Sequence, residues 1–179
     1  MSENKDVYAQ GKSQMRLSER IAAALPGFRG YKEKEIRRES DKLIRNHLTL
    51  KLTKDKDNVR SISQRIADKR YMDIFPDIDR LVAKMDRITE KVNHASYGYS
   101  GFYDIVKIKE ENLDRMIAYD NQLLDGVNAL TDSIDAVKTQ LVGGDTANLK
   151  DKIQGITDKL EMLEDTFDKR QEVIAGVTA

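Results

Sequence analysis

The sequence predicts an all-α protein: an elongated bundle of four main heptad-patterned helices, preceded by a short amphipathic helix. From Pro76 onward, apolar residues recur at alternating spacings of three and four across three successive segments. This pattern is typical of long helices that pack along a seam, the apolar stripe facing neighbouring helices. Charged residues make up 35% of the chain and aromatic residues 6%, which favours solvated helices over a sheet. Only two prolines, Pro26 and Pro76, interrupt the 179 residues.

Composition limits the class of protein. The length suffices for one domain with a core, and the absence of cysteine excludes disulfides and thiol chemistry. The N-terminus has no apolar signal region, and the longest apolar run, residues 21–25, is too short to cross a bilayer. We therefore expect a soluble, cytoplasmic protein with a tail and short helix over residues 1–25 and a helical domain over residues 26–179.

The first half of the chain predicts two helices. Residues 13–25 form the amphipathic helix, which Pro26 and Gly27 end. A long helix follows over residues 31–71, without Gly or Pro. Its seam changes phase near residues 53–58, which indicates either a stutter in one helix or a short loop between two, and continuity is favoured. The first seam contains Ile36, Leu43 and Leu50, with Ser40 and His47 between them; the second contains Leu48, Leu52, Val59, Ile62 and Ile66.

Three segments follow the long helix. Pro76 suits the first turn of a helix that ends near Ser96. A third helix extends from about Lys109 to Leu141, where Gly143 and Gly144 stop it. Asp145 is expected to cap the fourth helix, and the short link predicts an antiparallel hairpin. Two glycines in mid-helix, Gly126 and Gly155, indicate a close helix approach or a mild kink.

Aromatic residues gather in two turns. Four of them lie within residues 97–103, interleaved with two glycines, and they either cap the end of the bundle or form a recognition surface. A second aromatic and basic turn follows Pro26, and both turns lie at the same end if the helices alternate in direction. The candidate interaction surface comprises Phe28, Arg29, Tyr31, Tyr97, Tyr99, Phe102 and Tyr103.

Three polar residues occupy predicted seam positions: Ser40, His47 and Asp120. Polar seam residues can specify helix register. A buried charge is costly unless it is paired, so either Tyr119 replaces Asp120 in the core or a Lys or Arg neutralises Asp120. A functional pair of Asp120 with His47 is a further alternative.

Signatures of enzymes are mostly absent from the sequence: residues 11–13 match only the end of a P-loop, without its first glycine or a preceding strand. Only two histidines are present, His47 and His94, and neither follows a glutamate by three residues as in a di-iron bundle. Neither an H-E-x-x-H motif nor a calcium-binding loop occurs. We expect a non-enzymatic protein without a cofactor or metal.

Charge is divided unevenly along the chain. Residues 1–75 contain 18 Lys and Arg against 11 Asp and Glu, a net of +7, whereas residues 76–179 contain 13 against 20, a net of −7. Such halves attract each other within one molecule or between molecules. Cations alternate with anions over residues 32–35, which disfavours nucleic acid as a partner because phosphate binding needs a stripe of one sign.

Two segments resemble uncharacterised all-helical proteins of prokaryotes: residues 30–35 with Arg37 and Arg38, and residues 97–102. The resemblance covers about residues 26–140 and implies no activity and no site. The charge order, with an amphipathic N-terminal helix, a basic hairpin and acidic later helices, also resembles the phage-shock and ESCRT-III group, although no diagnostic motif of that group is present.

The sequence therefore favours a helical scaffold or protein-interaction module that associates with itself or with a partner protein. The main alternative is a membrane-remodelling coat that makes peripheral contact with anionic lipid. A helical bundle that binds a small ligand is the third hypothesis.

Overall fold

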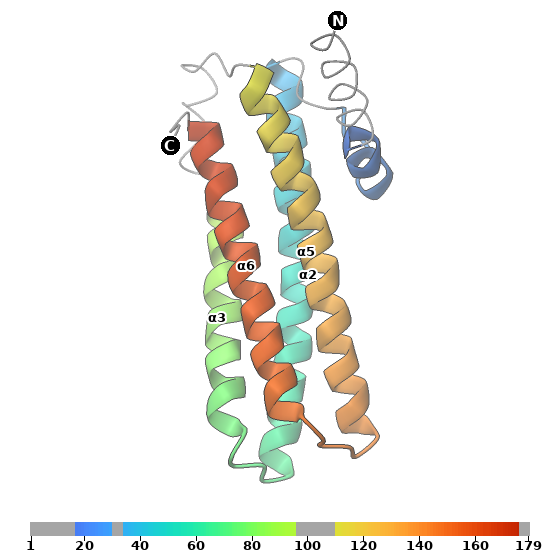
Figure 1. Cartoon of the computed structure of the whole chain (residues 1–179), viewed down its shortest axis with the longest axis vertical. Helices are drawn as coiled ribbons and strands as arrows, with labels where there is room; N and C mark the ends of the chain where they lie inside the picture. Colours follow the sequence, from blue (N-terminus) through green and yellow to red (C-terminus); the bar gives the residue numbers. More distant parts are fainter. Residues whose placement is uncertain (1–16, 30–33, 96–109, 176–179) are drawn as a thin grey trace, which may run out of the picture.

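The computed structural model describes residues 17–29, 34–95 and 110–175. Within these ranges the chain forms helices and turns and no strand, which confirms the all-α prediction for this part of the chain. Four long helices run side by side in an elongated molecule, and a short helix over residues 17–24 lies against them (Figure 1). The long helices are α2 (Lys34–Asp68), α3 (Phe75–His94), α5 (Glu110–Val142) and α6 (Leu149–Ala175).

The long helices pair as two antiparallel hairpins. A turn over residues 69–74 joins α2 to α3, and a turn over residues 143–148 joins α5 to α6. The hairpins stack so that α2 lies beside α5 and α3 beside α6 (Figure 1). The stacked helices run parallel, because residues in contact keep a constant separation of 77 along the chain, as in Arg87–Glu164 and Lys91–Asp168.

Helix α2 is continuous, so the interpretation of this region as one helix is correct. The predicted seam through Leu50 is wrong, because the Leu50 side chain is 72% exposed. The actual seam runs from Ile44 to Ile66 in steps of three and four, and Asp55 occupies one of its positions with 0% exposure. The polar stretch around Asp55 is therefore part of the packed helix rather than a loop.

The remaining helices begin and end close to the predicted residues. Pro76 lies in the first turn of α3, where its missing N–H leaves no hydrogen bond unmade. Helix α6 begins at Leu149, later than expected. Asp145 accepts a hydrogen bond from the backbone N–H of Ala147 at 2.8 Å, so it caps the turn before α6 rather than α6 itself.

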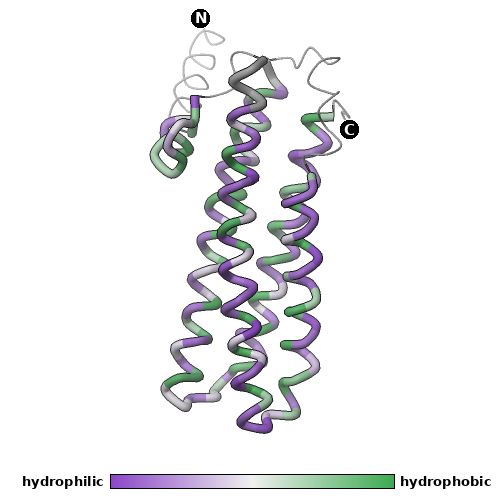
Figure 2. Tube along the Cα trace, turned by 180° about the vertical axis from the view of Figure 1, so that it is seen from behind, coloured by the Kyte–Doolittle hydropathy of each residue, from purple (hydrophilic) through white to green (hydrophobic). Residues whose placement is uncertain are grey.

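The core lies between the four helices and extends along their length. Hydrophobic and hydrophilic residues alternate along each long helix (Figure 2), as expected for helices that bury one face and expose the other. The buried apolar side chains form one continuous cluster with members from every long helix. Burial of this cluster supplies the main stabilising free energy, at about 25 cal/mol per Å² of apolar surface removed from water.

Candidate functional site

A cluster of four ionic side chains lies between α2, α5 and α6. Arg170 of α6 is 1% exposed, and its Nε donates to Oδ1 of Asp120 on α5 at 2.5 Å. Its NH1 nitrogen donates to Oδ1 of Asp41 on α2 at 2.8 Å. Arg45 donates to the other oxygen of Asp41, also at 2.8 Å. We call these four residues the ionic cluster; it joins three helices by contacts between side chains.

The ionic cluster balances its own charge. Two guanidinium groups face two carboxylates, as burial in a medium of low dielectric constant requires. Burial alone raises the pKa of Asp41, but the guanidinium groups of Arg170 and Arg45 outweigh that effect and hold the pKa below its ordinary value. Asp41 is therefore ionised at neutral pH.

The predicted polar seam residues have different environments. Ser40 and Asp120 are buried, whereas His47 is only partly buried. Burial and the nearby charge of Lys51 lower the pKa of His47, so this residue is neutral at pH 7. Of the three expectations for Asp120, neutralisation by a basic residue is correct, and the base is Arg170.

Sequence reasoning missed Arg170, although a signal for it was present. Leu163, Phe167 and Ile174 lie on the seam of α6. Seam positions alternate in steps of three and four. Arg170 lies three residues after Phe167 and four before Ile174, so it falls on the seam. The same reasoning applies to Asp55, which falls between Leu52 and Val59 on the seam of α2.

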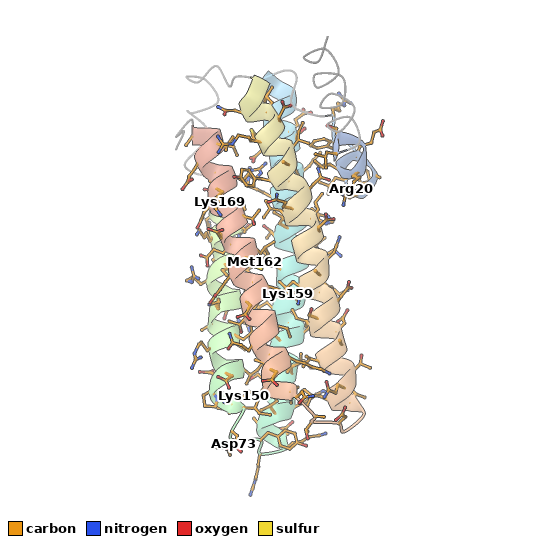
Figure 3. The ribbon with its side chains drawn as sticks, in the orientation of Figure 1. Arg20, Asp73, Lys150, Lys159, Met162 and Lys169 are labelled. Carbon is orange, nitrogen blue, oxygen red and sulfur yellow. The ribbon has the colours of Figure 1, made fainter. Side chains whose placement is uncertain are left out.

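The short N-terminal helix docks on the long helices. Ile21, Leu25 and Phe28 are buried. Arg20 donates through NH2 to both carboxylate oxygens of Asp125 on α5 at 2.8 Å; Arg20 is labelled in Figure 3. The side-chain amide of Asn121 donates to the backbone carbonyl of Leu17 at 3.1 Å. The apolar face of this helix is therefore covered by the protein's own bundle.

The candidate interaction surface is only partly described. Phe28 is buried and Arg29 is exposed. The other members, Tyr31, Tyr97, Tyr99, Phe102 and Tyr103, lie outside the described residues. The starts of α2 and α5 lie at the same end of the molecule, and α3 runs toward that end (Figure 1).

A third buried carboxyl group, that of Asp55, lies between the hairpins. Thr131 Oγ1 of α5 is 2.8 Å from Oδ2 of Asp55 and 2.9 Å from the carbonyl oxygen of Val127. Among the described side chains, Oδ1 of Asp55 has no hydrogen-bond partner. Burial raises the pKa of Asp55 above its ordinary value, despite the hydrogen bond with Thr131 and the nearby Lys51 and Lys54.

Ion pairs line the contact between α3 and α6, and we call them the ion ladder. Its cations lie on α3 and its anions on α6: Lys84 pairs with Glu161, Arg87 with Glu164, and Lys91 with both Glu164 and Asp168. Hydrogen bonds from Arg87, and then from Lys91, lower the pKa of Glu164 to about 2 although partial burial opposes the shift. The ladder is partly exposed, so each pair is worth about 1 kcal/mol or less.

Several ion pairs join the basic first half of the chain to the acidic second half. Arg20 pairs with Asp125, and both Arg60 and Lys56 pair with Asp86. Attraction between the two halves therefore acts within one molecule.

The described part of the chain also bears on metal and membrane binding. It contains no group of three or more metal-ligating side chains placed to hold an ion. None of its helices combines the length and apolar character needed to cross a bilayer. The polar side chains described above form ion pairs and hydrogen bonds between helices.

Comparisons of the chain with protein-family models, curated proteins and solved structures find no match.

Proposed function

We propose that the protein is a non-enzymatic helical scaffold that associates with itself. The four long helices act as a coiled-coil-type bundle, a stiff rod that displays surfaces rather than a pocket for chemistry. One observation carries this proposal. Each ionisable side chain in the described core, namely Asp41, Asp55, Asp120 and Arg170, contacts a side chain of another helix.

These contacts support a structural role because each of them runs from one helix to a neighbouring helix. A catalytic group presents its polar atoms to a substrate in a cleft. The buried groups of this chain instead join neighbouring helices, and buried polar groups of this kind fix helix register and orientation. A bundle with fixed register presents its outer faces in a constant arrangement, which is what a scaffold requires.

Light scattering of the full chain over a series of protein and salt concentrations tests the proposal. We expect a mass above the 20.4 kDa of one chain at low salt, because oppositely charged surfaces attract. Association through exposed charges should weaken as salt rises, since such charges are screened within about 10 Å at 0.1 M, whereas association through apolar seams should persist at high salt. A strictly monomeric mass at low salt and high protein concentration contradicts self-association.

The alternative is a coat that binds anionic membranes through the N-terminal helix. Because Ile21, Leu25 and Phe28 are buried against the bundle, membrane insertion first requires that this helix undock. Flotation with vesicles rich in anionic lipid separates the two functions. The scaffold proposal expects no flotation, whereas flotation that is lost on deletion of residues 1–25 supports the coat.

A further inference from the structure

The two hairpins carry opposite charge. Residues 34–94 contain 16 Lys and Arg against 11 Asp and Glu, a net of +5. Residues 110–175 contain 7 against 15, a net of −8. We call them the basic hairpin and the acidic hairpin. Opposite net charges accelerate encounter and favour pairing of unlike surfaces over like ones.

One side of the contact between the hairpins is the ion ladder of α3 and α6. Lys84, Arg87 and Lys91 each pair with the residue 77 positions later in the chain. All three cations belong to the basic hairpin and all three anions to the acidic hairpin. A basic hairpin therefore finds its complement in an acidic hairpin and is repelled by another basic one.

The other side of the contact, between α2 and α5, fixes the register. Asp55 meets Thr131 within the core, and Asn58 accepts a hydrogen bond from Lys138 at 2.7 Å. At the far end of the hairpins Arg170 binds Asp41. Shifting one hairpin along the other by a helical turn breaks all of these contacts, so the hairpins fit in one alignment.

We propose that the hairpins exchange between copies, so that the basic hairpin of one chain binds the acidic hairpin of a second chain in this same alignment. The inference rests on the proposed self-association and supplies its contact. A second copy is the occupant because it presents the matching charge, the matching seam and the matching ladder. Such exchange is an economical route to a dimer, since it remakes contacts that already exist within one chain.

Closure within one chain competes with exchange. Residues 96–109, 14 in number, link the hairpins, and a short link gives the intramolecular contact an effective concentration in the millimolar range. The exchanged dimer therefore grows with protein concentration, and it dominates when closure within one chain is blocked.

Charge reversal in the full-length chain weakens that closure, because it replaces the attractive pairs of the ladder with repulsive ones. One variant carries Lys84→Glu, Arg87→Glu and Lys91→Glu, which places acidic residues on both sides of the ladder. The other carries Glu161→Lys, Glu164→Lys and Asp168→Lys, which places basic residues on both sides. When the variants are mixed, exchange pairs each hairpin with an oppositely charged one, and both ladders of the dimer are restored.

We expect the equimolar mixture to form a species containing both variants, at about twice the 20.4 kDa of one chain. An alternating longer assembly of the two variants equally supports exchange. If the mixture contains only the two separate variants, exchange is overturned. In that case an oligomer of the wild-type chain that persists at low salt leaves the scaffold proposal standing, with a different contact.

Two controls keep the test decisive. A chain with all six reversals has its ladder restored with opposite sign and should fold with the stability of the wild type. If the single-sided variants do not fold alone, refolding them together should recover the helical circular dichroism signal of the six-fold variant, and no recovery overturns the proposal.

A second mixture carries the same charge changes at exposed positions outside the ladder and should form no complex: Lys42→Glu, Lys54→Glu and Arg65→Glu in one chain, and Asp132→Lys, Asp151→Lys and Asp158→Lys in the other.

Discussion

The Asp55–Thr131 contact places one hydroxyl group between two acceptor oxygens. The Thr131 hydroxyl has a single hydrogen, yet two acceptors lie within 2.9 Å of its oxygen. Both contacts become hydrogen bonds when Asp55 is protonated, because Asp55 then donates to Thr131 while Thr131 donates to Val127. Burial is the main cause of the raised pKa of Asp55, and the hydrogen bond that ionised Asp55 accepts from Thr131 lowers that pKa.

Replacing Asp55 with Asn should stabilise the protein at neutral pH. A carboxyl group whose pKa is raised in the folded state favours folding at low pH and opposes it as pH rises through the folded pKa. Asp55→Asn keeps the shape and removes the charge, so we expect a gain on the order of 1 kcal/mol at pH 7. The gain should shrink as pH falls toward 4, and urea unfolding at several pH values measures it.

The exposed neighbour Asp57 provides the matched control, because Asp57→Asn changes the same charge on the same helix at the surface. We expect that control to change stability by less than about 0.5 kcal/mol. A loss of stability in Asp55→Asn at pH 7 contradicts the interpretation, since it means that the buried charge contributes favourably.

The two mid-helix glycines should respond differently to alanine. A Cβ at Gly155 meets no described atom within 4 Å, so Gly155→Ala should gain about 1 kcal/mol from helix propensity. A Cβ at Gly126 lies 3.1 Å from Cδ1 of the buried Leu163, which offsets that gain. Melting temperatures of the two variants measure the difference, about 2–4 °C for a chain of this size. Equal stabilisation of both variants contradicts the proposed close approach at Gly126.

At the scale of residues, the apolar seam was predictable except in the first part of α2, where Leu50 is exposed, and the polar positions within it were only partly predictable. Asp120 was found because apolar residues surround it on the seam of α5. Asp55 and Arg170 were missed because charged residues were assigned to the surface even where the seam spacing placed them inside. The side-chain partner of a buried charge also depends on which helices are neighbours, and the spacing of one helix does not specify this.

At the scale of elements, the ion ladder makes the α3–α6 contact different from the others. Its charged pairs make this contact more polar than a seam filled only with Leu and Ile. It is therefore the contact that should respond most to pH and salt.

Acid should weaken the ladder through Glu164. A carboxylate with a lowered pKa stabilises the fold above its ordinary value of 4.5, and that contribution is lost as pH falls toward about 2. Glu164→Gln removes the contribution at all pH values, so we expect it to cost about 1 kcal/mol at pH 7 and little at pH 2.5. Chemical unfolding at the two pH values measures the change.

Glu172 on the same helix is the control for this variant, because it is exposed. Glu172→Gln should leave both stability and its pH dependence nearly unchanged. If Glu164→Gln costs as much at pH 2.5 as at pH 7, the contribution of Glu164 comes from packing rather than from its charge.

The existence and type of the helices followed from the sequence, whereas their arrangement did not. The spacing of apolar residues, the prolines and the glycines predict the positions of α2, α3, α5 and α6 to within a few residues, because these signals act locally. Parallel stacking of the two hairpins depends on contacts such as Arg87–Glu164, which join residues 77 apart. Many cations and anions in a chain with 35% charged residues offer alternative pairings, so the sequence alone does not select among them.

At the scale of the whole molecule, the ionic cluster joins the two hairpins near one end. Arg170 belongs to the acidic hairpin and Asp41 to the basic hairpin, so this pair reverses the polarity of the ion ladder. A hairpin that slides along its partner loses the cluster and the ladder together. The two sets of contacts lie at different heights and on different helices, and together they define the alignment of the molecule.

Replacing Arg170 with Met should destabilise the whole molecule more than any change in the ladder. The variant keeps apolar bulk but leaves Asp120, which is 0% exposed, without its guanidinium partner. Removing one partner of a buried ion pair costs about 3–5 kcal/mol. Protonation of Asp120 removes its charge, so the loss should be smaller at pH 5 than at pH 7.

A second variant, Arg170→Met with Asp120→Leu, should recover most of the stability at pH 7, because Asp41 keeps its pair with Arg45. Guanidinium unfolding of the wild type and both variants at the two pH values makes the comparison. If the double variant is no more stable than Arg170→Met, the loss arises from packing around Arg170, and the ionic cluster does not hold the hairpins together through its charges.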